Sequence, residues 1–215
     1  MKKLILILFV FIYFFGIVTV YADLPLSGRV ILIDAGHGAF DPGKVGARKT
    51  LEKEINLNIA LKLQYLLELS DAYVLMTRAE DKALGSTKEA DMHGRRYLAN
   101  TGEADILISI HQNAYSNGTP VGPMVFHYSD EPYSKSLATS IQNNLNEELG
   151  RSSKRKPKIN KNYFILKKTT IPAVIVECGF LTNSWDLDSL RQDIYQEKVA
   201  WAIYKGITEY FINDK

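Results

Sequence analysis

The sequence contains a single cysteine, Cys178, so no disulfide bond can form within the chain. Its stability must therefore come from a hydrophobic core, even in an oxidising compartment. Of the 215 residues, 46% are hydrophobic and 23% are charged, which is the balance of an ordinary globular protein rather than a disordered one. The sequence shows no internal repeat, low-complexity tract or linker, and its length suits one domain with a short additional segment.

The chain also has almost no net charge. Its formal charge is +2, and both Lys2 and Lys3 lie within residues 1–22, which contain no acid. The remaining residues therefore carry 24 bases and 24 acids. A neutral domain has no overall field that attracts a phosphate backbone, so we expect no nucleic-acid partner.

The N-terminal residues have the organisation of an export signal. A positive start, Met1-Lys2-Lys3, precedes an apolar run of 17 residues, Leu4–Val20, and Val20-Tyr21-Ala22 forms a small-x-Ala cleavage pattern. This pattern predicts a signal peptide over residues 1–22 and a catalytic domain over residues 23–215. The alternative is an uncleaved N-terminal membrane anchor, although the run is short for a membrane span. Either way, we expect the domain to act outside the cytoplasm and to meet a membrane only through this segment.

From Arg29 onward, short apolar segments alternate with segments of helical periodicity. Strands are expected at Val30–Ile33, Tyr73–Thr77, Ile106–Ile110, Gly122–Tyr128 and Ala173–Val176. Helices are expected at Glu52–Leu69, Lys88–Asn100, Leu137–Leu149 and Gln192–Ile212. Strands that are apolar throughout are typical of a parallel sheet covered on both faces. The sequence therefore predicts a single α/β domain with a twisted, mostly parallel sheet flanked by helices.

Polar residues follow three of the expected strands. Asp34-Ala35-Gly36-His37-Gly38 follows the first strand, His111 follows the third and Glu177 follows the last. The carboxyl ends of parallel strands share one edge of a sheet, where ligand sites gather, so we expect these side chains to converge. Glu52 begins the first helix, and glycines in the loop 39–51 would let that loop fold back towards the first histidine.

Two imidazoles and a carboxylate, with one position left open, form a catalytic zinc site. A further carboxylate, Glu177, would act beside it as a general base. Each residue also has a purely structural explanation. A histidine after a strand is often only a polar residue at a loop start, and Glu52 is the kind of acid favoured in the first turn of a helix. Glu177 follows Ala-Val-Ile-Val and fits such an explanation less well, because a buried acid must be paired or functional. Spacing alone leaves both explanations open.

Further motifs follow in order along Val30–Phe211, and together they resemble the zinc-dependent N-acetylmuramoyl-L-alanine amidases of the amidase-3 type. They are Asp41-Pro42-Gly43, Glu52-Lys53-Glu54-Ile55-Asn56-Leu57, Thr77-Arg78, Ala104-Asp105, Ser109-Ile110-His111-Gln112-Asn113-Ala114, Ile171-Pro172-Ala173 and Gly179-Phe180-Leu181-Thr182-Asn183. The resemblance implies hydrolysis of the amide bond between muramic acid and L-alanine in peptidoglycan. It implies that Zn²⁺ is held by His37, Glu52 and His111. It also implies that Glu177 is the catalytic glutamate.

The resemblance further implies roles in substrate binding for Arg95 and Asn113. Arg95 would brace the site or meet a substrate carboxylate, and Asn113 would hydrogen-bond a substrate amide. The alternative for Asn113 is a loop cap. The alternative for Arg95 is a solvated charge on its helix. The residues of that helix expected to face inward are Met92, Tyr97 and Ala99.

The sequence departs from the family pattern at two positions. Ala39 stands where another glycine is common, and Gln112 stands where a small residue is common. Neither removes a ligand, although Gln112 would narrow the site or touch substrate. Glu54 is a rival to the carboxylate two positions before it, but residues two apart on a helix point about 200° apart, so only one can face the metal. Cys178 is expected to face away from Glu177 into the core, because side chains alternate along a strand.

Nothing in this sequence resembles a separate wall-binding domain, and Tyr128–Tyr163 is too short for the extra helix that blocks the site in some division-associated relatives. A minimal exported domain of this type is most similar to the germination-specific amidases of spore formers. That similarity implies a role on spore cortex peptidoglycan and an activating protein partner. The alternative functions are those of an exported zinc peptidase acting within stem peptides and of a partner-dependent or non-catalytic wall-binding protein.

The basic run Arg151–Lys168 has eight bases and no acid. It would either bind anionic wall groups or form a solvated loop.

Overall fold

The computed structural model describes residues 24–150 and 155–213. The predicted signal peptide or anchor over residues 1–22 lies outside these residues, as does part of the basic run, residues 151–154. Among the helices of the described residues, none has both the length and the apolar character needed to span a membrane.

The centre of the fold, within the described residues, is a six-stranded sheet with the strand order β2-β1-β3-β6-β4-β5. Its strands are β1 (Val30–Ala35), β2 (Tyr73–Met76), β3 (Ile106–Asn113), β4 (Met124–His127), β5 (Lys158–Ile159) and β6 (Ala173–Phe180). Neighbouring strands pair in parallel except where β4 runs antiparallel to β6. The expectation of one α/β domain with a mostly parallel sheet is confirmed.

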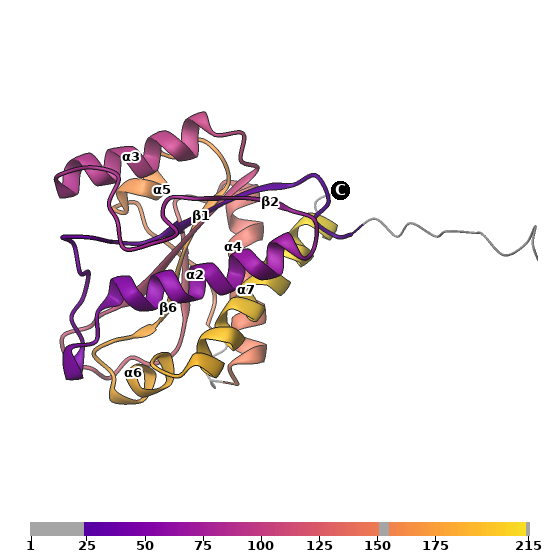
Figure 1. Ribbon diagram of the computed structural model, residues 1–215. Coiled ribbons are helices and arrows are strands. Elements are labelled where there is room, and N and C mark those ends of the chain that lie inside the picture. The colour runs from indigo at the N-terminus through magenta and orange to yellow at the C-terminus, as the bar shows by residue number, and fades with distance from the viewer. Residues whose placement is uncertain (1–23, 151–154, 214–215) are drawn as a thin grey trace, which may run out of the picture.

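Helices cover both faces of this sheet (Figure 1). They are α2 (Glu52–Glu68), α3 (Lys88–Thr101), α4 (Pro132–Glu148), α5 (Phe164–Lys168), α6 (Ser184–Leu190) and α7 (Asp193–Asn213), with a 3₁₀ turn, η1 (Ala47–Lys49). Helix α7 packs between α2 and α4 to form one layer, and α3 and α5 pack together on the other side.

Strand β1 shows why the central strands are apolar at nearly every position. Ile31 and Ile33 belong to the core shared with α2, α4 and α7, while Leu32 between them belongs to a second core shared with α3 and α5. Strand β6 repeats this alternation, with Val176 in the first core and Ile175 in the second. Because helices cover both faces, water reaches neither, and hydrophobic residues are favoured on both sides of each strand.

The sequence patterns missed β5, α5 and α6, because a strand of two residues and helices of five and seven residues carry too little periodicity to be recognised. Helix α4 also begins earlier than the expected Leu137. The Glu131 carboxylate accepts hydrogen bonds from the backbone N–H groups of Tyr133 and Ser134, and Pro132 takes the first helical turn. This cap and proline start the helix before its apolar periodicity begins.

The topology brings the ends of β1, β3 and β6 to one edge of the sheet. In the register of these strands, Ala35 pairs with Ile110, and His111 pairs with Glu177. The loop after β1 and the polar ends of β3 and β6 therefore share this edge, as the sequence predicted.

Candidate active site

Three side chains from distant parts of the sequence meet at this edge: His37 after β1, Glu52 at the start of α2, and His111 in β3. Oε1 of Glu52 lies 3.2 Å from Nε2 of His37 and 3.0 Å from Nδ1 of His111. The two imidazole rings lie edge to face with their centroids 4.9 Å apart. One potential ligand atom from each residue lies within 4.8 Å of the other two, so this group could hold a metal ion.

The loop between β1 and α2 folds back to bring His37 and Glu52 together. Gly43 has a φ of +67°, and a Cβ at this position would lie 2.6 Å from both Oε2 of Glu52 and Cδ2 of His37. The backbone N–H of Lys44 donates to Oε2 of Glu52 at 2.7 Å. His37 itself has a φ of 62°, a left-handed conformation that costs a non-glycine residue about 1–2 kcal/mol. Such strain is typical of functional sites.

Gly36 leaves room for the imidazole of His111. A Cβ on Gly36 would lie 2.2 Å from Cε1 of that ring. Gly36→Ala is therefore expected to displace the ring and to weaken metal binding about tenfold or more, as changes beside metal ligands do. Metal titration of the purified variant measures this effect. Gly46→Ala is the matched control, because its added methyl group meets the flexible end of Leu187 at 3.2 Å. An unchanged metal affinity in Gly36→Ala would contradict the prediction.

The Glu52 carboxylate is buried and held from several sides. Its Oε1 accepts hydrogen bonds from the backbone N–H of Gln112 at 3.1 Å and from the Asn56 amide at 3.4 Å. Burial would raise the pKa of Glu52, but hydrogen bonds from the two imidazoles outweigh it and hold the pKa well below its ordinary value. The carboxylate is therefore ionised. The rival Glu54 is exposed, so Glu52 is the acid that faces the cluster.

Asp41 supports the first histidine of the cluster. Its Oδ2 lies 2.9 Å from Nδ1 of His37 and 3.3 Å from Nζ of Lys88. Burial would raise the pKa of Asp41, but the hydrogen bond with His37 outweighs it and the pKa is lowered. A carboxylate that binds one imidazole nitrogen orients the ring and fixes its tautomer, which is the usual support of a metal-binding histidine.

Glu177 lies on β6 beside His111 and is only 6% exposed. Its Oε1 accepts a hydrogen bond from the Tyr163 hydroxyl at 3.2 Å, whereas its buried Oε2 has no hydrogen-bond partner among the described residues. Burial raises the pKa of Glu177 to about 7, against the opposing attraction of His111. A buried carboxyl group with one free oxygen beside such a cluster is a candidate for proton transfer.

Arg95 lies beneath the site and is 2% exposed. Its guanidinium donates to protein acceptors from all three nitrogen atoms: Nε to Asp91 at 2.7 Å, Nη1 to Asp34 at 2.6 Å and to the carbonyl of Ala35 at 2.8 Å, and Nη2 to the carbonyl of His37 at 2.6 Å. These bonds fit the bracing role expected of Arg95. They do not fit a solvated helix charge. Arg95 also lines the small cavity over the cluster, and its contact with a substrate carboxylate stays a prediction.

The Arg95–Asp34 ion pair is expected to contribute strongly to stability. Burial would raise the pKa of Asp34, but Arg95 lowers it from 3.8 to about 2. Arg95→Met would leave buried carboxylates unpaired and lower the free energy of unfolding by about 3–5 kcal/mol near neutral pH. Because the folded pKa lies below the unfolded one, the stabilisation is present above about pH 4 and is lost as the pH falls towards about 2.

Urea unfolding of the wild type and Arg95→Met at about pH 7 and about pH 3 tests this prediction. The deficit of the variant should shrink at the lower pH, and a deficit that stays constant would contradict the ion-pair explanation. Arg96→Met, at the next position of α3, is the matched control. Arg96 is partly exposed, so its replacement should change the free energy of unfolding little.

The remaining residues singled out in the sequence lie either near the site or in the hydrophobic core. Oδ1 of Asn113 accepts from the backbone N–H of Ala114 at 2.8 Å, which is the loop-capping role, and its contact with a substrate amide stays a prediction. Gln112 is buried and donates to Oδ1 of Asn56 at 3.1 Å, so it supports the cluster from below instead of narrowing the site. Cys178 is fully buried in the core, as expected.

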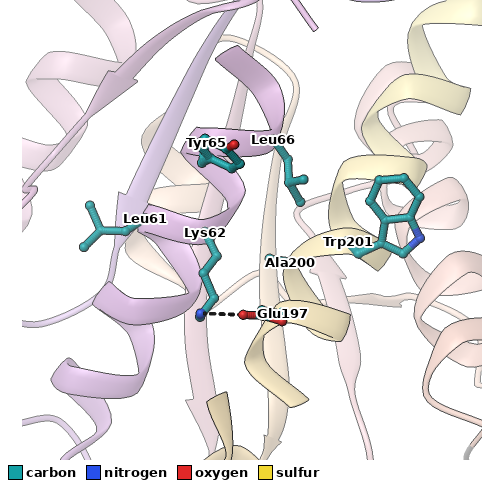
Figure 2. Close-up of a pocket in the computed structure, with 7 residues that line it drawn as sticks. All are labelled: Leu61, Lys62, Tyr65, Leu66, Glu197, Ala200 and Trp201. Atoms are coloured by element: carbon teal, nitrogen blue, oxygen red, sulfur yellow. Dashed lines mark hydrogen bonds and ion pairs between the residues drawn. The ribbon is translucent and has the colours of Figure 1, made fainter. Parts of the chain in front are cut away.

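A cavity of about 100 Å³ lies over the cluster and is lined by its two histidines, by Glu177 and by residues of α3 and α5. A larger groove, of about 540 Å³, lies between α2 and α7, where Lys62 and Glu197 form an ion pair at 3.3 Å (Figure 2). No histidine lines this groove, and its acid is already paired. The candidate site is therefore identified by its chemistry and not by its size.

Comparison with known proteins agrees with this geometry. Residues 31–209 match the Amidase_3 family, which is described as N-acetylmuramoyl-L-alanine amidase. The chain belongs to this family. Its activity is therefore that of an N-acetylmuramoyl-L-alanine amidase on peptidoglycan.

Two relatives from Bacillus subtilis (strain 168) illustrate the match. This amidase is 36% identical over 197 residues to the germination-specific N-acetylmuramoyl-L-alanine amidase, and the alignment covers 88% of this chain and 82% of that protein. It is 34% identical over 191 residues to the N-acetylmuramoyl-L-alanine amidase LytC, covering 87% of this chain and 36% of that protein.

Solved structures show the same fold. The CwlD amidase from Clostridioides difficile, in complex with the GerS lipoprotein, superposes with a TM-score of 0.83 at 36% identity, covering 86% of this chain and 100% of that one. The N-acetylmuramoyl-L-alanine amidase from Clostridium difficile 630 gives a TM-score of 0.79 at 31% identity, covering 87% of this chain and 98% of that one.

The candidate site of this amidase includes two residues to which the sequence analysis gave no role. Asp41 lies four positions after His37 within a family motif, and that spacing could have suggested its support of the ring. Tyr163 lies 14 positions before Glu177, on another element, and no sequence pattern links the two.

Proposed function

We propose that this amidase is a zinc enzyme in which His37, Glu52 and His111 hold the metal. The observation that carries the proposal is the approach of two imidazole nitrogens to one carboxylate oxygen, at 3.2 and 3.0 Å. Two histidines and a carboxylate suit Zn²⁺ and leave a fourth position open, as catalytic zinc sites do. When bound, zinc would polarise the substrate carbonyl and make a water molecule more acidic.

In the proposed reaction, Glu177 moves the proton. Its Oε2, which has no hydrogen-bond partner among the described residues, takes a proton from the attacking water. Glu177 then passes this proton to the alanine nitrogen, which leaves poorly as an anion. A general base and acid works best when its pKa lies near the working pH. The pKa of about 7 that burial gives Glu177 supports this role.

The bond proposed for cleavage is the amide between muramic acid and L-alanine. Zinc-loaded enzyme is incubated with purified peptidoglycan, and the soluble products are analysed by mass spectrometry. We expect free stem peptides that begin with alanine, together with glycan that has lost its peptides. Peptides cut within the stem would favour an exported zinc peptidase instead. Bound zinc without product would favour a partner-dependent or non-catalytic wall-binding protein.

We further propose that the enzyme acts outside the cytoplasm, where it modifies spore cortex peptidoglycan in preparation for germination. Support comes from the similarity over 88% of the chain to a relative named germination-specific and from the export pattern of residues 1–22. A spore former that carries Glu177→Gln in place of this enzyme should make spores that begin germination but do not degrade their cortex. Normal cortex degradation in that strain would remove the proposed role.

We also propose that an activating protein partner is needed for full activity of this enzyme. The supporting observation is that a similar amidase, at 36% identity, was solved in complex with a lipoprotein. The tagged chain is purified from sporulating cells, and its rate is compared before and after a salt wash that strips bound proteins. We expect activity to fall on washing and to return when the stripped protein is added back. Full activity of the washed enzyme would exclude dependence on a partner.

A further inference from the structure

The Glu177 carboxylate is held from one side only. Its Oε1 accepts the hydrogen bond from the Tyr163 hydroxyl at 3.2 Å, and Oε2 is buried with no partner among the described residues. The terminal torsion of a glutamate is broad and roughly two-fold, so a carboxylate without a fixed partner rotates readily. The direction in which Oε2 points therefore depends on the one bond made by Oε1.

Tyr163 is fixed well enough to set that direction. Its ring meets Phe126 of β4 edge to face, with the centroids 5.4 Å apart, and both rings pack against the core beneath α3 and α5. Tyr163 also caps α5, since its carbonyl accepts the backbone N–H of Lys167 at 3.0 Å. Burial and the neighbouring Glu177 carboxylate raise the pKa of the Tyr163 hydroxyl, which therefore stays protonated and donates.

Tyr163 and Glu177 line the cavity that also contains His37 and His111. We infer that Tyr163 is a positioning residue, whose hydroxyl holds Oε1 of Glu177 so that Oε2 faces the reacting atoms. The inference rests on the proposed role of Glu177 in proton transfer. It also gives part of the basic run a function, because residues 155–168 carry this tyrosine into the site.

Removing this hydroxyl should affect the chemical step and little else. Proton transfer requires the reacting atoms in near-attack geometry, and a misplacement of about 1 Å can cost about a hundredfold in rate. Tyr163→Phe keeps the ring and its contact with Phe126. We therefore expect its kcat to fall about tenfold to a hundredfold, with KM and zinc content unchanged. A residue that only shaped the cavity wall would change KM instead.

The test uses purified, zinc-loaded enzyme and soluble, uncross-linked peptidoglycan fragments, so that kcat and KM are measured separately. Tyr128→Phe is the matched control, since Tyr128 is also half-buried against the core beneath α3 and α5 but lies outside the cavity over the cluster. Its kcat should equal that of the wild type. In a Glu177→Gln background, Tyr163→Phe should cause no further loss, because the hydroxyl acts through that carboxylate.

Two results distinguish a failure of this inference from a failure of the proposed function. If Glu177→Gln is inactive and Tyr163→Phe has the kcat of the wild type, positioning by Tyr163 is wrong and the role of Glu177 stands. If Glu177→Gln keeps its full kcat, the proposed function fails and the inference fails with it. A loss in Tyr163→Phe that appears as a raised KM or as lost zinc would also overturn the positioning role.

Discussion

Glutamine in place of Glu177 is expected to lower kcat about a thousandfold while the metal stays bound. The carboxamide has nearly the same size and still accepts a hydrogen bond from Tyr163, but it cannot take a proton from water. Proton transfer by a positioned side chain contributes about 10²–10⁴ to a rate, and a thousandfold is the middle of that range. The fold should tolerate the change, because a neutral amide costs less to bury than a carboxylate.

The measurement is kcat on soluble peptidoglycan fragments, with zinc content determined by mass spectrometry on the same preparation. Glu54→Gln is the matched control, since it makes the same chemical change at an exposed position of α2, two residues from a proposed ligand. It should keep the rate of the wild type. A Glu177→Gln enzyme that retained more than about a tenth of the wild-type kcat would lack the loss expected of a general base.

The sheet was predictable because its strands follow a simple physical rule. Where helices cover both faces, hydrophobic residues are required on both sides of a strand, and β1 and β6 can be recognised from such runs alone. The position of helix α4 was predicted correctly, but its start was placed five residues too late, at Leu137 instead of Pro132. Its start depends on Glu131 and Pro132, and a cap gives a weaker signal than periodicity.

The convergence of the site was predictable from topology. Parallel strands end at a common edge, so the polar residues after β1, β3 and β6 had to lie near one another. Helical geometry required that only one of Glu52 and Glu54 face the cluster, and the family resemblance favoured Glu52. The structure buries Glu52 in the cluster and leaves Glu54 exposed. The roles of these residues as ligands and base stay predictions, which the variants described here test.

The burial of Arg95 and the contact between Tyr163 and Glu177 were not predictable from sequence patterns, because the partners that explain them are distant in sequence. The periodicity of α3 predicted Tyr97 inward, yet Tyr97 is 63% exposed and Arg95 is 2% exposed. An arginine is buried only where carboxylates and carbonyls satisfy it, and its partner Asp34 lies 61 positions away. No local pattern contains that information. The bond between Tyr163 and Glu177 was hidden for the same reason.

Removal of the metal is expected to abolish turnover, and added Zn²⁺ is expected to restore it. His37→Ala should lose both zinc and activity, and added zinc should not restore them, because only two ligands remain. His93→Ala is the control, since His93 is exposed and outside the cluster, and this variant should keep its zinc. Binding should also stabilise the fold, by about 2.7 kcal/mol at a zinc concentration a hundred times Kd. Turnover that survived complete chelation would exclude a metal-dependent reaction.

Protons should compete with zinc for this cluster. Burial lowers the pKa of His111, but the hydrogen bond and charge of Glu52 raise it above its ordinary value of 6.5. Without metal, the cluster therefore holds a proton more firmly than a free imidazole does. Because zinc binds only neutral imidazole, its affinity is expected to fall as the pH drops from about 8 to about 6. Glu52→Gln removes the carboxylate that raises this pKa, so its weaker zinc binding should begin to fall only at a lower pH. If the zinc affinity of both enzymes depended on pH in the same way, Glu52 would not influence the protonation of His111. That result would contradict the proposal that the two residues bind one metal ion.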